Sequence, residues 1–266
     1  MHKIAAFCFI LLFSAASWAD AEQRSIPGKK SIKVAPEVEV PVNIYGASRQ
    51  RLILWLPSEH GVLAAEQTIA AQLAQFGYEV WVADLFSARF LPAIPISLGQ
   101  IPPSDVAQLI AAAARRHAKI YLLSSGQGAG RALEGAQAWQ QGQARRTLAG
   151  AVLLFPNLHA ASPEPGEAPP YLPIASQTRL PLAVLQGELS PWYWQLDELK
   201  AQLERGGSRV AVMSFPGLRD RFYFREDALP REREAGLQLA ADIDASIRSL
   251  PLINDRKPHE TPAPQH

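Results

Sequence analysis

Apolar side chains follow two different periods along the chain, and segments of the two kinds alternate. Val38, Val40, Val42 and Ile44 occupy every second position, which is typical of a half-buried strand. Compact apolar runs, which predict strands buried on both faces of a parallel sheet, follow at residues 51–56, 78–85, 120–123, 148–155, 181–185 and 209–215.

Segments with a helical period separate these runs. Leu63, Ile69 and Leu73 fall on one side of a helix that Gly77 ends, and Ser104 is predicted to cap the next helix. Further helices are expected at residues 129–140, 194–203 and 235–250. Strands and helices that alternate in this way predict an α/β fold with a doubly wound, mostly parallel sheet.

Two long connections interrupt the alternation. Residues 86–104 hold several large apolar side chains among prolines, and they either line a pocket at the carboxyl edge of the sheet or pack over that edge. Residues 156–180 are rich in proline and lack a period, so we expect a loop or small flap and no large lid domain.

The amino end has the pattern of a secretory signal peptide. Lys3 precedes an apolar core at residues 4–13, and small residues stand at positions 17 and 19. Cleavage is expected after Ala19, with export to the periplasm or beyond, and an uncleaved anchor is the alternative. The apolar core at residues 4–13 is shorter than the roughly 20 apolar residues of a spanning helix, which favours a signal peptide over an anchor. We therefore expect no stable membrane span after cleavage.

The rest of the chain divides into three parts. Residues 20–36 are polar and without a period, which predicts a flexible linker. Residues 37–250 form one domain, and residues 251–266, with several prolines and scattered charges, are expected to be a disordered tail.

Composition narrows the possible chemistry. Removal of residues 1–19 takes away Cys8, the only cysteine, and leaves 25 basic and 25 acidic residues. The mature chain therefore has no disulfide, cysteine-ligated zinc or thiol nucleophile, and its charge gives no reason to expect nucleic acid as a partner. No cofactor is expected.

One phrase joins a buried strand to a helix through small residues. Residues 124–130, Ser-Ser-Gly-Gln-Gly-Ala-Gly, resemble the nucleophile elbow of α/β-hydrolases, in which G-x-S-x-G presents a serine above the sheet. A strand that ends near Gly187 and the phrase Phe215-Pro216-Gly217 extend the resemblance over residues 37–250, closest to dienelactone-hydrolase-like members. The chain also resembles secreted bacterial proteins of this fold, without assigned activity, that carry glycine in place of the elbow serine.

The residue types at the three triad positions depart from that family. The resemblance places Gly126 at the nucleophile position, Ser190 at the acid position and Asp220 at the base position. Acyl transfer by this route needs an oxygen nucleophile, a base that accepts its proton and a carboxylate that orients the base. We therefore expect no catalytic residues at these positions, although glycine suits the positive φ of the turn.

A displaced set of residues is the alternative. Ser125 or Ser124 would supply the hydroxyl, and His60, in the loop where the resemblance implies an oxyanion-binding amide, or His159 would act as the base. The two histidines with a carboxylate would also permit a metal site, but no spacing supports one and none is expected.

Candidate ligand-binding residues surround the same positions. Ser58 and His60 lie in the oxyanion loop, and Gln127 follows the elbow apex. Trp192 and Trp194 offer large apolar area with a polar edge, although packing of the next helix explains them equally well.

Two arginines flank Asp220. Arg219 and Arg221 would attract a carboxylate or another anion if they line the cleft, and otherwise would form surface ion pairs with Glu226 and Asp227.

Three functions follow from these residues. The leading hypothesis is a secreted α/β-hydrolase-fold protein that has lost its triad and binds a small molecule or an envelope protein without catalysis. The second is an esterase-like serine hydrolase with a relocated nucleophile and base. The third is a scaffold component of a cell-envelope assembly, with the proline-rich segments as contacts.

Overall fold

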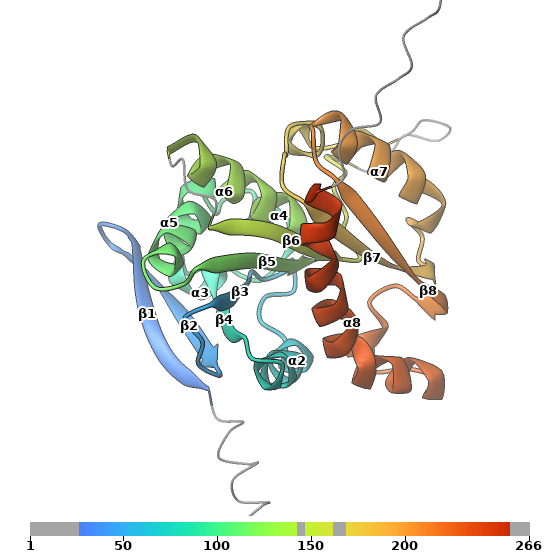
Figure 1. Cartoon of the computed structure of the whole chain (residues 1–266), viewed down its shortest axis with the longest axis horizontal. Coiled ribbons are helices and arrows are strands. Elements are labelled where there is room, and N and C mark those ends of the chain that lie inside the picture. The colour runs from blue at the N-terminus through green and yellow to red at the C-terminus, as the bar shows by residue number, and fades with distance from the viewer. Residues whose placement is uncertain (1–26, 143–146, 162–168, 256–266) are drawn as a thin grey trace, which may run out of the picture.

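The protein contains one eight-stranded sheet in the order β1-β2-β4-β3-β5-β6-β7-β8. The computed structural model describes residues 27–142, 147–161 and 169–255 (Figure 1). The strands are β1 (Gly28–Ala35), β2 (Val38–Tyr45), β3 (Arg51–Trp55), β4 (Glu79–Ala83), β5 (Lys119–Ser125), β6 (Leu148–Leu154), β7 (Leu182–Leu189) and β8 (Val210–Arg219). β1 pairs antiparallel with β2 and β2 antiparallel with β4, whereas all other neighbours are parallel.

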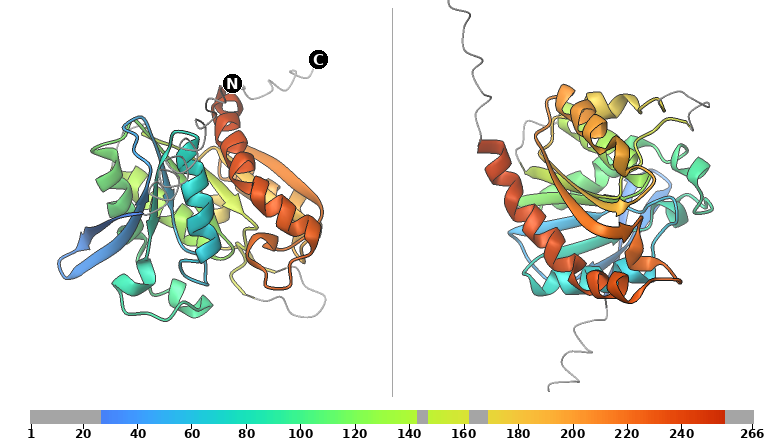
Figure 2. Two further views of the ribbon diagram at one scale, coloured as in Figure 1. Left: turned by 90° about the horizontal axis from the view of Figure 1, so that it is seen from below. Right: turned by 90° about the vertical axis from the view of Figure 1, so that its right-hand side faces the viewer.

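Helices cover both faces of this sheet, as the alternating pattern predicts. The helices are α2 (Ala64–Gln75), α3 (Leu85–Ala88), α4 (Pro95–Leu98), α5 (Pro103–Ala114), α6 (Gly128–Gly142), α7 (Leu196–Arg205) and α8 (Pro230–Asp255), with 3-10 turns η1 (Pro173–Ser176), η2 (Tyr193–Gln195) and η3 (Phe222–Phe224). Figure 2 shows α2 and α8 on one side of the sheet and α5 and α6 on the other. The sheet is therefore doubly wound, and the described residues include no large lid domain.

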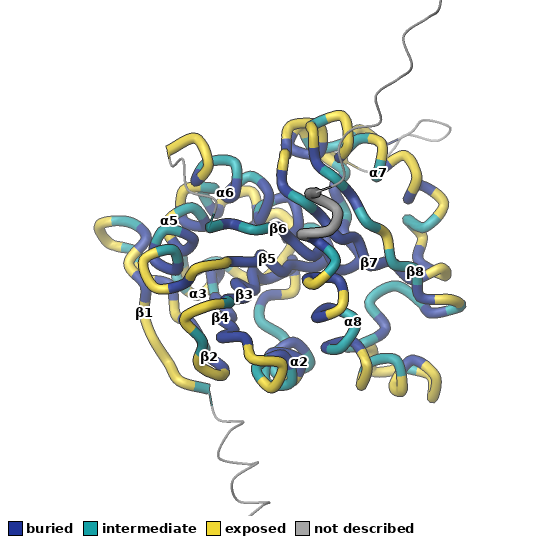
Figure 3. Tube along the Cα trace, viewed as in Figure 1, coloured by how far each residue is buried: buried dark blue, intermediate teal, exposed yellow. Residues whose placement is uncertain are grey.

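Two apolar cores lie on the two faces. Leu54 and Leu122 pack toward α5, α6 and α7, while Ile53, Trp55 and Leu123 pack toward α2 and α8. Neighbouring residues of one strand therefore enter opposite cores, which is why the central strands are apolar at every position. Figure 3 shows these strands as the buried centre of the molecule.

Both predicted ends of the domain were placed wrongly. Residues 28–35 belong to β1 and pair with β2, so this part of the predicted linker is an edge strand. The strand is polar because an edge strand exposes most of its side chains, and only Ile32 and Val34 are buried in β1. This polarity is the reason that the sequence predicts a linker here. At the other end α8 continues to Asp255, so the predicted tail cannot begin at residue 251.

Three internal boundaries also differ. Pro102 rather than Ser104 is the cap residue of α5, and a proline occupies the first helical turn, where its missing N–H costs nothing. The loop at residues 86–104 contains α3 and α4, and Asp84 accepts a hydrogen bond from Ser87 N to cap α3. β8 runs through the phrase Phe215-Pro216-Gly217 to Arg219.

The predicted signal peptide, residues 20–26 and the last eleven residues of the predicted tail lie outside the described residues. Within the described part of the chain, none of the helices combines the length and the apolar content that crossing a membrane requires.

Candidate functional site

The elbow has the strand-turn-helix geometry that its sequence predicts. β5 ends at Ser125, Gly126 turns with φ +55°, and α6 begins at Gly128. Gly126 N donates to Leu154 O at 3.1 Å, and Asn157 N donates to Gly126 O at 2.9 Å, so the following strand fixes the turn. A Cβ at Gly128 would lie 2.2 Å from Pro57 O, so the helix can begin this close to β3 only with glycine.

The carboxylate of Glu59 fills the space above Gly126. A Cβ built on Gly126 would lie 2.5 Å from Oε2 and 3.0 Å from Oε1 of Glu59. Gln127 N, the backbone N–H that directly follows the apex, donates to Glu59 Oε2 at 2.9 Å. In the α/β-hydrolase elbow the N–H at this position belongs to the oxyanion hole. An internal carboxylate therefore holds the donor that a reaction intermediate would need.

Arg221 completes an ion-pair network around this carboxylate. Its Nη1 donates to Glu59 Oε1 at 2.6 Å and its Nε to Asp220 Oδ2 at 2.9 Å. Asp220 Oδ1 in turn accepts from Ser190 Oγ at 3.1 Å. The structure thus joins two of the three predicted triad positions directly, Ser190 and Asp220, and connects them to the third through Arg221 and Glu59.

The turn after β8 gives Arg221 its direction. Arg221 has φ +48°, in the left-handed region that is strained for a residue with a side chain. Its Nη1 also lies 2.9 Å from His60 Nε2, and the His60 ring packs edge-on against Phe224. The His60 ring thus faces a guanidinium, and among the described residues it has no hydrogen bond with a serine hydroxyl.

The two candidate displaced nucleophiles are buried. Ser124 and Ser125 have no exposed surface. Ser125 Oγ donates to Glu66 Oε1 at 3.1 Å, and Tyr223 OH donates to the same oxygen at 3.2 Å. Burial raises the pKa of Glu66 to about 7, because the effect of burial is larger than the lowering of the pKa by the hydrogen bonds that the carboxylate accepts. Ser125 is therefore part of a buried network below the elbow.

His159, the other candidate base, lines the pocket beside α6 and contacts two aromatic rings. Its ring centroid lies 4.5 Å from that of Tyr171 and 4.9 Å from that of Trp192, and each pair of rings is tilted by 39°. Burial lowers its pKa. The structure therefore places His60 and His159 apart from the serines they would have to activate.

The remaining predicted ligand residues have mixed outcomes. Ser58 is buried, and its Oγ accepts from His60 N at 3.1 Å within the loop turn. Trp192 contacts His159, whereas Trp194 is 76% exposed on η2. Arg219 forms the ion-pair alternative, with Asp227 at 2.8 Å and with Glu232, which the sequence did not suggest, at 2.6 Å.

A pocket of about 250 Å³ adjoins the elbow. Its walls come from α4, the first half of α6 and the segment after β6, and it is lined by Pro95, Ile96, Leu98, Gly99, Gln127, Gly130, Arg131, Glu134, Asn157, His159, Ala160 and Leu172. Residues of the 86–104 loop serve both predicted roles, because Ile96 lines the pocket while Phe86 is buried in the core.

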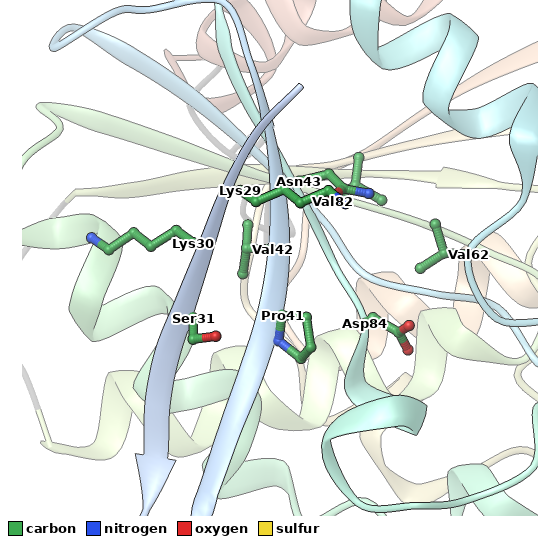
Figure 4. A pocket seen from close by; sticks show the side chains of 9 residues that line it. All are labelled: Lys29, Lys30, Ser31, Pro41, Val42, Asn43, Val62, Val82 and Asp84. Atoms are coloured by element: carbon green, nitrogen blue, oxygen red, sulfur yellow. The ribbon is translucent and has the colours of Figure 1, made fainter. Parts of the chain in front are cut away.

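Two further hollows share no lining residue with this pocket. One of about 380 Å³ lies over β1, β2 and β4, and Figure 4 shows the Lys30 side chain directed away from the other residues that line it. The other, of about 490 Å³, lies between α2, η3 and α8, and Tyr223 and Leu237 are among its lining residues. Neither hollow contains a residue of the Glu59 and Arg221 network.

Glu59 and Glu66 are functional candidates that the sequence patterns do not indicate. Glu59 stands next to His60 in the predicted oxyanion loop, so the sequence places it near the elbow. The neighbouring residues do not indicate that its carboxylate turns toward Gly126. Glu66 is visible only as an acid in the first turn of a helix. In the part of the chain that the structure describes, no three His, Cys, Asp or Glu side chains gather as metal ligands.

Known structures share this fold at low sequence identity. A protein assigned as a dienelactone hydrolase from Klebsiella pneumoniae is similar with 15% identity and a TM-score of 0.63, over 84% of this chain and 98% of that one. A hyperthermophilic esterase from the archaeon Pyrobaculum calidifontis has 15% identity and a TM-score of 0.61, over 86% and 90%.

Thermogutta terrifontis esterase 2, in a form phosphorylated by paraoxon, has 16% identity and a TM-score of 0.57, over 84% and 95%. No family model and no curated protein matches the chain. The protein therefore has the α/β-hydrolase fold.

Proposed function

We propose that this protein is a secreted, non-catalytic binding protein built on the α/β-hydrolase fold. The observation that carries the proposal is the position of the Glu59 carboxylate, which accepts the Gln127 N–H and occupies the place of a side chain at Gly126. A hydrolase of this fold needs that place for its nucleophile and that N–H for the oxyanion.

The acid and base positions support the same conclusion. Ser190 and Asp220 keep the mutual contact of an acid and a base, but Ser190 is the donor and Asp220 the acceptor. Asp220 is also paired with Arg221. Both oxygens of Asp220 thus already accept hydrogen bonds, one from Ser190 and one from Arg221.

The esterase names of the structural neighbours favour the competing hypothesis of a serine hydrolase with a relocated site. Burial weighs against it, since Ser125 and Ser124 have no exposed surface that a substrate could reach. Export rests on the signal-peptide pattern of residues 1–19, and the scaffold role rests on the proline-rich segments alone.

Labelling with a fluorophosphonate probe and turnover of short-chain aryl esters test the proposal. The expected result for the wild-type protein is neither labelling nor turnover above that of heat-denatured protein. The matched variants are Ser125→Ala and Ser176→Ala, the latter a surface serine away from the elbow. Turnover that Ser125→Ala abolishes and Ser176→Ala retains would establish the hydrolase instead.

A further inference from the structure

We propose that the space above Gly126 is a carboxylate-binding site, that Glu59 occupies it as an internal ligand, and that the carboxylate of a small external ligand takes its place. The inference rests on the proposed non-catalytic function and names the ligand class of the same site.

The donors of this site match the two oxygens of a carboxylate one by one. Gln127 N donates to Oε2 at 2.9 Å, while Arg221 Nη1 donates to Oε1 at 2.6 Å. An arginine and a backbone N–H at the start of a helix both favour a negative charge. The site is therefore built for an anion, and Glu59 shows the shape of anion that fits.

Glu59 can leave without disturbing the fold around it. The turn that carries it is closed by Gly61 N donating to Ser58 O at 3.1 Å and by His60 N donating to Ser58 Oγ at 3.1 Å. None of these bonds involves the Glu59 side chain, so rotation of that side chain alone empties the site.

Solvent reaches the site from the side of Arg221 and His60. Glu59 is only 6% exposed, but the side chains of Arg221 and His60 retain 26% and 44% of their exposure. A ligand can approach Arg221 there and compete with Glu59 for the guanidinium, which remains paired with Asp220 throughout.

The adjoining pocket has room for the rest of such a ligand. Gln127, whose N–H holds the carboxylate, also lines the pocket of about 250 Å³, and Arg131, Asn157 and His159 add polar groups to its walls. That volume equals about eight water molecules in the liquid, which suits a compound of metabolite size. The geometry points to a small organic acid with a polar body.

Acetate serves as the probe, and the variant Glu59→Ala opens the site. We expect the Tm of Glu59→Ala to rise saturably with acetate and the Gln127 amide resonance to shift along the same curve. Phosphate, sulfate and chloride at equal ionic strength separate a carboxylate from other anions, and acetate is expected to bind tightest because two in-plane oxygens match the two donors.

Glu59→Gln is the matched control, because its side-chain amide fills the site without a charge. It is expected to respond to acetate at concentrations between those that Glu59→Ala and the wild-type protein require, because a neutral amide competes for the Gln127 N–H and the Arg221 guanidinium more weakly than a carboxylate does. In the wild-type protein the Gln127 resonance is expected to shift only at acetate concentrations at least about tenfold higher, since Glu59 competes from the same chain.

Two results would overturn the inference. An absent acetate response in Glu59→Ala, or a response at the same concentrations as in the wild-type protein, removes the carboxylate site. A response in Glu59→Ala without any Gln127 shift in the wild-type protein shows that external ligands do not displace Glu59. Both outcomes are independent of fluorophosphonate labelling, so a failure here is distinguishable from a failure of the proposed function.

Discussion

The carboxylate of Glu59 and the α-carbon of Gly126 share a space that can hold only one side chain. A Cβ on Gly126 would approach Glu59 Oε2 to 2.5 Å, and the two residues lie next to each other although they are far apart in the chain. The glycine at the apex therefore leaves the room that the Glu59 carboxylate occupies, and a side chain at position 126 would have to displace that carboxylate.

Gly126→Ser is expected to lower the free energy of unfolding by about 3 kcal/mol and to produce no esterase activity. The serine meets the Glu59 carboxylate and also takes a left-handed φ, and each effect costs on the order of 1–3 kcal/mol. Urea unfolding and aryl ester turnover are the measurements.

A double-mutant cycle with Glu59→Ala isolates the contact. In the Glu59→Ala background the same serine is expected to cost about 1–2 kcal/mol less, because the clash is gone. An equal cost in both backgrounds would mean that Glu59 does not occupy the space above Gly126.

Arg221→Met is expected to destabilise the protein by about 3 kcal/mol. Methionine keeps much of the apolar volume, but Glu59, which is buried, and Asp220 lose their shared cation, and an uncompensated buried charge costs about 3–5 kcal/mol. Arg225→Met is the matched control, because among the described residues the Arg225 side chain pairs with the exposed Asp227 alone, and this substitution is expected to cost less than about 1 kcal/mol. Similar costs for the two variants would contradict the network.

Glu66 is expected to make the stability of the wild-type protein fall as the pH rises. Its pKa of about 7 in the folded state lies above the ordinary value of 4.5, so the folded state holds the proton more tightly. The stabilisation is complete below pH 4.5 and is lost between about pH 4.5 and 7.

Glu66→Gln keeps the shape of the side chain and cannot titrate. Its stability relative to the wild type is expected to improve by about 2–3 kcal/mol between pH 5 and 8, by linkage to the raised pKa. Urea unfolding at several pH values measures the difference, and the titration of other groups cancels between the two proteins. A constant difference across this range would show that Glu66 is charged throughout.

Ser190→Asp, which restores a carboxylate at the acid position, is expected to destabilise the protein at pH 7. Ser190 Oγ lies 3.1 Å from Asp220 Oδ1, so the new carboxylate would face a like charge. Relative to the neutral Ser190→Asn, the loss is expected to shrink as the pH falls and one of the two carboxylates takes up a proton. A pH-independent difference between these variants would show that the two side chains do not face each other.

The alternation of hydrophobic periods by itself determined the architecture. A strand can be apolar at every position only in the middle of a parallel sheet that is covered on both faces. The sequence alone therefore identifies residues 51–56 and 148–155 as central strands. The elbow was recognisable for a local reason as well, since Gly126 and Gly128 permit a turn that a side chain would block. An edge strand carries no comparable pattern, and the sequence therefore predicts a linker where β1 lies.

Only the tertiary structure decided what occupies the site. Glu59 meets Gln127 across 68 residues and Arg221 across 162 residues of chain, and no local pattern encodes such a distance. The direction of each side chain depends on the packing of the loops that follow three different strands, β3, β5 and β8. The sequence shows that Gly126, Ser190 and Asp220 differ from a triad, whereas the fold shows that a carboxylate and a guanidinium from elsewhere have filled the space between them.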